Sequence, residues 1–213
     1  VQNSEIAIAK LDQNNKVLWL KNFDFELDSA GADANHFLAD IKVTTEGVVG
    51  LIRSLALDSS RVVNTMLHIT ANGDVKFAAK LGSELFPREV IFDERTNLFI
   101  ASFFGDTAEP DVKVNSELSV RGVNGLGEEI WHLDYAYSGN YLKMLTTQAQ
   151  ILVGGNFSLI KNEAGRTFSM PSGTNSFILS MDYSGALKKV MCYNSDESFQ
   201  STIFYKVTDR NLN

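Results

Sequence analysis

The sequence predicts an all-β fold made of repeated four-stranded units, and three observations support this prediction. First, one hairpin-like pattern occurs four times: an apolar run, a polar turn and a second apolar run. Second, successive turns are 58, 54 and 58 residues apart, a near-constant spacing that is typical of repeat architectures. Third, no stretch keeps a helical apolar period long enough to indicate a helix. The four turn residues are Asn15, Gly73, Gly127 and Gly185.

Each of these turns has the chemistry of a β-hairpin. Asn72-Gly73 and Ser184-Gly185 lie between apolar runs, and Gly accepts the positive φ that tight hairpin turns require. Asn15 can adopt the same conformation at a higher steric cost. The four predicted hairpins are Ile8–Trp19, Leu67–Phe77, Arg121–Trp131 and Ser180–Val190.

A second hairpin alternates with the first, at Phe37–Ile52, Val90–Phe104 and Tyr141–Phe157. Its small residues Gly50, Ala101 and Gly154 align with spacings of 51 and 53 residues, which gives the same period. Four strands per repeat match the blade of a β-propeller, with an inner hairpin at 37–55 followed by an outer hairpin at 64–81. A solenoid is the alternative, but its repeats are shorter, at about 20–30 residues.

The period places three complete blades at about 24–81, 82–134 and 135–192, with partial blades at 1–23 and 193–213. The first partial blade, Ser4–Phe23, is an outer hairpin, and Thr202–Val207 has the pattern of a first inner strand. The two could share one blade and close a four-bladed ring. We favour the alternative, a single propeller domain that is a fragment of a longer chain or part of a larger assembly, because unpaired strand edges invite further pairing.

Two segments carry a resemblance to known repeats: Ile6–Trp19, and Gln150–Ser158 followed by Phe177–Gly185. They resemble secreted bacterial propellers of the seven-bladed propeller repeat and delta-60 repeat families, and Asp12–Trp19 is similar to the repeats of pyrroloquinoline-quinone-type propellers. The second and third repeats lack the Asp of this pattern. The resemblance implies a β-propeller fold and a secreted, periplasmic or cell-surface setting, and it carries no chemistry.

Composition excludes several classes of partner. The net charge is −7 and no basic run exceeds two residues, so a nucleic-acid partner is not expected. The apolar stretches are too short for a transmembrane segment. The single cysteine, Cys192, cannot form an internal disulfide, which favours a bacterial envelope or surface protein over a small secreted eukaryotic domain.

The sequence predicts no catalytic, cofactor-binding or metal-binding residues. His36, His68 and His132 lack the spacing of metal ligands, so we expect structural or surface roles for them. Asp12–Asn15 is oxygen-rich, but it lacks the distal Glu of a calcium loop, and a hairpin turn explains it. The glycine pairs have no following Lys-Ser/Thr for a phosphate loop, and no His is placed to activate Cys192.

Trp19, Phe77 and Trp131 occupy equivalent places in their repeats. This equivalence predicts that all three are largely buried between adjacent sheets. An aromatic platform for a sugar ring is the alternative.

The expected function is that of a non-catalytic extracytoplasmic module that binds or scaffolds a protein or a glycan. The long polar connections at 24–36, 105–116 and 158–175 favour it, because recognition is often built on variable loops. The alternative is an enzyme or cofactor-binding propeller, with polar residues around the axial channel. The residues that would line that channel are Asp40, Lys42, Lys143 and Lys206.

Overall fold

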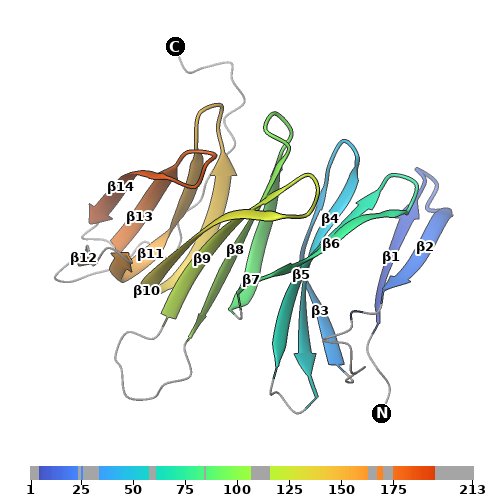
Figure 1. The fold of residues 1–213 in the computed structure, drawn as a ribbon, viewed down its shortest axis with the longest axis horizontal. Helices are drawn as coiled ribbons and strands as arrows, with labels where there is room; N and C mark the ends of the chain where they lie inside the picture. The colour runs from blue at the N-terminus through green and yellow to red at the C-terminus, as the bar shows by residue number, and fades with distance from the viewer. Residues whose placement is uncertain are drawn as a thin grey trace. The chain divides into compact units, whose positions relative to one another are not determined.

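A computed structural model describes residues 5–23, 25, 34–57, 61–83, 85–106, 116–162, 167–169 and 175–194 of the 213-residue chain. Within these ranges the backbone forms fourteen strands and no helix (Figure 1). The all-β prediction is therefore confirmed. The chain divides into two compact units, Val1–Phe103 with Arg121–Ile130 and Phe104–Val120 with Trp131–Asn213, and each is considered by itself below.

Unit 1 contains the first hairpin and a complete four-stranded sheet. The hairpin consists of β1 (Ile6–Leu11) and β2 (Val17–Phe23). The sheet has the antiparallel order β3-β4-β5-β6, as predicted for an inner hairpin followed by an outer one. Its strands are β3 (Ala34–Val43), β4 (Gly47–Ala56), β5 (Val62–Thr70) and β6 (Val75–Leu81).

The third sheet has the linear order β14-β13-β11-β10-β9-β8-β7, and β12 pairs with β11. Its strand β10 passes without a break through residues 134 and 135, where the sequence placed a blade boundary. Ring closure and the number of blades stay predictions. The strands are β7 (Phe86–Asp93), β8 (Leu98–Asp106), β9 (Ser116–Asn124), β10 (Glu129–Thr146), β11 (Ile151–Asn162), β12 (Thr167–Ser169), β13 (Asn175–Met181) and β14 (Leu187–Asn194).

The four predicted turn residues have the same geometry. The φ angles of Asn15, Gly73, Gly127 and Gly185 are 62°, 90°, 86° and 82°. The backbone N–H of each donates to the carbonyl three residues earlier, at 3.0 Å in every case. Three of these turns also have an Asp or Asn at that earlier position, whose side chain accepts two further backbone hydrogen bonds. The prediction of four equivalent hairpin turns is confirmed.

The small residues of the inner hairpins lie in the expected strands but not at equivalent positions. Gly50, Ala101 and Gly154 lie in β4, β8 and β11. Gly50 pairs with Leu67, six residues before its turn glycine, whereas Gly154 pairs with Ile178, seven residues before its own. Because side chains alternate between the faces of a sheet, this one-residue shift places Gly50 and Gly154 on opposite faces.

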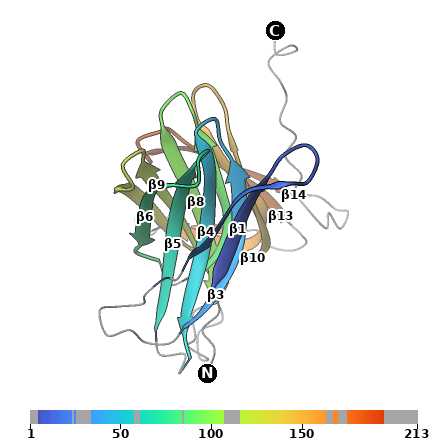
Figure 2. The same ribbon diagram turned by 90° about the vertical axis from the view of Figure 1, so that its right-hand side faces the viewer.

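The β3–β6 sheet of unit 1 is covered on both faces. Figures 1 and 2 show the β1–β2 hairpin on one side of it and β7 and β8 on the other. Ile52, Leu67 and Ile69 pack against the hairpin, while Met66 and Phe77 join a cluster with residues of β7 and β8. Cover on both faces explains why the residues of β5 from Asn64 to Ile69 are all buried.

Candidate binding site at the edge of the first hairpin

The three equivalent aromatic residues share one contact. Each ring packs over the turn glycine of the next of the four repeated hairpins: Trp19 over Gly73, Phe77 over Gly127 and Trp131 over Gly185. A Cβ atom added to these glycines would lie only 3.1, 2.8 and 2.7 Å from the nearest ring atom. A Cβ atom would therefore collide with the ring at Gly127 and Gly185, and it would be tight at Gly73. We call each of these contacts a seam.

The burial prediction for these rings is confirmed for Phe77 and is only partly right for the tryptophans. Phe77 is buried, whereas Trp19 and Trp131 are partly exposed. The reason is the indole N–H, which donates to a turn carbonyl at 3.1 Å in both cases: Ala71 O for Trp19 and Tyr183 O for Trp131. A ring fixed against a glycine and a carbonyl is a structural contact, which disfavours the alternative of an open sugar platform.

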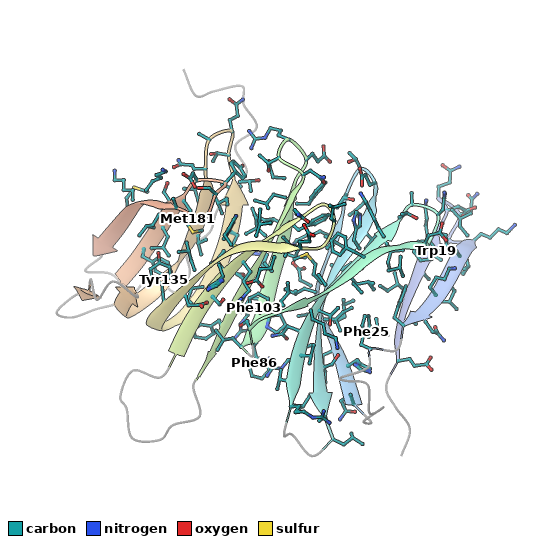
Figure 3. All side chains as sticks on the ribbon, in the orientation of Figure 1. Trp19, Phe25, Phe86, Phe103, Tyr135 and Met181 are labelled. Atoms are coloured by element: carbon teal, nitrogen blue, oxygen red, sulfur yellow. The ribbon has the colours of Figure 1, made fainter. Side chains whose placement is uncertain are left out.

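A pocket of about 390 Å³ lies within unit 1 beside Trp19, whose position is labelled in Figure 3. Its wall is formed by the end of β1, the turn between β3 and β4, and the end of β5. Lys10 is its only charged lining residue, and the Lys10 ammonium donates to Ala71 O at 2.9 Å. The other lining residues are Ala9, Leu11, Val43, Thr44, Thr45, Gly47, Val48, Thr70 and Ala71.

The pocket adjoins a strand edge that the described residues leave unpaired. Among them, β1 pairs only with β2, although the equivalent strand β5 pairs with β4 on one edge and β6 on the other. Among the described strands, β1 therefore has no counterpart of β4 beside it. Unpaired edges expose a row of backbone N–H and C=O groups that can bind another strand.

An apolar surface lies on β3 beside this edge. Leu38 and Ile41 pair with Ile52 and Gly50, so they lie on the sheet face that the β1–β2 hairpin covers farther along. The start of β3 is buried on this face, but its second half is left partly open by the described residues, and the exposed fractions of Leu38, Ile41 and Val43 are 40%, 42% and 86%. We call these three residues the β3 shelf.

The polar residues proposed for an axial channel are only partly brought together. The Lys42 ammonium lies 3.5 Å from the Asp40 carboxylate and 4.0 Å from that of Glu89 on β7. Asp40 also accepts a hydrogen bond from Val90 N at 2.9 Å. These charges satisfy one another, which indicates a structural cluster. Lys143 belongs to unit 2, and Lys206 lies outside the described residues.

The three histidines have separate environments. The His36 ring is hydrogen-bonded to Ser54 Oγ at 2.8 Å, and His132 is exposed and 4.0 Å from Asp134. His68 is fully buried, and neither of its ring nitrogens has a hydrogen-bond partner. Across the described part of the chain, no group of three or more His, Cys, Asp or Glu side chains could hold a metal ion.

His68 is the feature that the sequence analysis missed. Its ring centroid lies 5.4 Å from that of Phe77 and 5.0 Å from that of Phe99. Burial lowers the pKa of His68, and the positive charge of Lys76 lowers this pKa further, whereas Glu46 raises it. Its position between Leu67 and Ile69 was the available signal, because both neighbours belong to a strand buried on its two faces.

Of the remaining predictions, some fall outside the described residues and one is confirmed. The connections at 24–36, 105–116 and 158–175 fall largely outside the described residues, so their binding role is untested. Asp12–Asn15 forms a hairpin turn, as expected. None of the described residues forms a helix long and apolar enough to span a membrane. Comparison with protein-family models and with curated proteins found no match to this chain.

Proposed function

We propose that this chain is a non-catalytic, extracytoplasmic β-propeller module that binds an extended segment of a partner protein along the edge of β1 that no described strand pairs. The observation that carries the proposal is the combination of an unpaired strand edge with the β3 shelf beside it. Extended peptides bind such edges by main-chain hydrogen bonds, and pockets for alternate side chains provide specificity.

The surroundings of the edge indicate which peptide would fit. A strand added to β1 would direct every second side chain toward the β3 shelf, where burying apolar side chains is favourable by about 25 cal/mol per Å². Lys10 supplies the only charge in the pocket, so an acidic side chain is favoured there. The bound segment is therefore expected to alternate apolar and polar residues and to carry an Asp or Glu.

The propeller part of the proposal is supported by sheet stacking and by the repeated seams. Within unit 1 three consecutive layers pack face to face, and the same aromatic contact recurs at each seam. The extracytoplasmic setting follows from the resemblance to secreted bacterial propellers. The alternative of an enzyme has less support, because Asp40, Lys42 and Glu89 are engaged with one another.

A displayed peptide library, selected on the wild-type chain, tests the proposal. A selected peptide should bind in calorimetry and slow the hydrogen exchange of β1 amides. Ile41→Lys, in the β3 shelf, should abolish this binding. Leu126→Lys is the matched control, because Leu126 is 79% exposed at a distant turn of the same unit. Equal binding to both variants, or unchanged exchange in β1, would refute the proposal.

A further inference from the structure

In the described part of the chain, one face of the β1–β2 hairpin is covered and the other is largely exposed. Ile6, Ile8 and Trp19 are on the covered face, against the β3–β6 sheet. On the other face, Leu11 pairs with Val17 and Ala9 pairs with Leu20. Leu11, Val17 and Leu20 are 49%, 53% and 60% exposed, and we call this apolar surface the outward face.

The equivalent of the outward face is covered in the next hairpin. Ala9 and Leu11 lie six and four residues before Asn15, and Leu67 and Ile69 lie six and four residues before Gly73. Leu67 and Ile69 are almost completely buried, because the β1–β2 hairpin packs on them. The outward face therefore corresponds to the face of the β5–β6 hairpin on which the β1–β2 hairpin packs.

The hairpin of β13 and β14 has the opposite arrangement. Phe177, Leu179 and Met181 correspond to Thr65, Leu67 and Ile69, and their face is fully buried. On its other face Ile178 is half-buried, and Lys189 is exposed. Lys189 stands four residues after its turn glycine, where the three earlier hairpins have Trp19, Phe77 and Trp131. This fourth hairpin therefore lacks the aromatic ring of a seam.

The fourth hairpin lacks the ring of a seam, and the first hairpin lacks the glycine that would receive one. It has Asn15 in place of glycine, and a side chain at that position would collide with an aromatic ring placed as over Gly127 or Gly185. A flexible Lys avoids this collision. It is also a donor, and Gln13 O is the equivalent of the Ala71 and Tyr183 carbonyls that accept from the indoles. The nearby Asp12 carboxylate has the complementary charge.

We infer that the β13–β14 hairpin of a second copy of this chain docks on the outward face, with Lys189 of one copy over Asn15 of the other. The two surfaces are different, so the contact is heterologous and joins copies head to tail. It continues the face-to-face order of the seams, and it uses the face of β1 and β2, which is distinct from the edge that binds the partner segment.

Cysteine crosslinking tests this inference directly. In a Cys192→Ser background, Asn15→Cys and Lys189→Cys are made as separate variants, mixed, and treated with a short bifunctional maleimide. A crosslink between the two variants can form only between copies, and we expect it as the main product. Each variant alone should give much less crosslinked dimer, because the contact pairs unlike surfaces.

Sedimentation of the uncrosslinked chain provides the second measurement. The average mass should rise with concentration, and Leu20→Glu on the outward face should abolish both this rise and the crosslink. Leu126→Glu is the control and should change neither. Three results would each overturn the inference: a mass that does not depend on concentration, association that survives Leu20→Glu, or, in an added variant with both Asn15→Cys and Lys189→Cys, a crosslink that forms only within one chain.

Discussion

Replacing His68 with leucine should stabilise unit 1. The neutral imidazole has one donor and one acceptor nitrogen, and both are buried without partners. An unsatisfied buried polar atom costs about 1–3 kcal/mol, and exchanging the ring for an apolar side chain of similar size costs less than about 1.5 kcal/mol. Two such atoms outweigh the cost of the exchange even at the lower limit, so the variant should gain at least about 0.5 kcal/mol in the free energy of unfolding at pH 8.

The same substitution should remove part of the acid sensitivity. The pKa of His68 is lowered in the folded chain, so below its unfolded value of about 6.5 the unfolded state binds more protons than the folded state. Above that pH the titration of His68 does not affect stability, and below it the free energy of unfolding falls by up to about 1.4 kcal/mol per pH unit during acidification. The His68→Leu variant lacks this dependence.

Urea unfolding between pH 8 and pH 5 measures both effects. In a Trp131→Phe background, the fluorescence of Trp19 reports on unit 1 alone. His132→Gln is the control for removing a histidine elsewhere: His132 is exposed and belongs to unit 2, so the unfolding free energy of unit 1 should change by less than about 0.5 kcal/mol. A His68→Leu variant that is less stable than wild type at pH 8, or that loses stability on acidification as steeply as wild type, would refute the reasoning.

Three further predictions concern the seams and the last hairpin. Gly127→Ala should destabilise unit 1 by more than about 1 kcal/mol in urea unfolding, because φ is positive there and the added Cβ would meet the Phe77 ring; an unchanged midpoint would contradict this. Trp131→Phe should cost unit 2 about 0.5–1.5 kcal/mol by losing one hydrogen bond, against about 3–5 kcal/mol for Trp131→Ala, measured by circular dichroism during denaturation. The pKa of Asp182 should be far below its ordinary value in carboxyl NMR, because Lys188 donates a hydrogen bond to it, and Lys188→Met should raise that pKa.

The turns and the strand order could be predicted because their causes are local. A positive φ requires glycine or asparagine, and this requirement places a recognisable residue at every hairpin tip. The order of inner and outer hairpins then follows from short connections between neighbouring strands. Both features depend on residues that are close in the sequence.

Register and partners could not be predicted, because they depend on contacts between distant segments. Gly50 and Gly154 mark equivalent strands, but a small residue alone does not show which sheet face it occupies. The equivalence of Trp19 and Trp131 predicted a shared location. It could not show that each indole N–H would bind a carbonyl 52 positions away, which keeps the rings partly exposed.

The seams combine these two levels, because each one requires a specific residue from each of two successive hairpins. A ring four residues after one turn requires glycine at the next turn, and Trp19, Phe77 and Trp131 are each followed by such a glycine. In each seam the earlier hairpin supplies the ring and the later one supplies the glycine. The hairpin with Asn15 at its turn is therefore poorly suited to receive a ring, and the hairpin with Lys189 has no ring to supply. These two departures relieve the steric restriction at the same kind of contact. Asn15 and Lys189, the two residues that depart from the repeat, are therefore the ones that would allow the outward face of one copy to contact the β13–β14 hairpin of another.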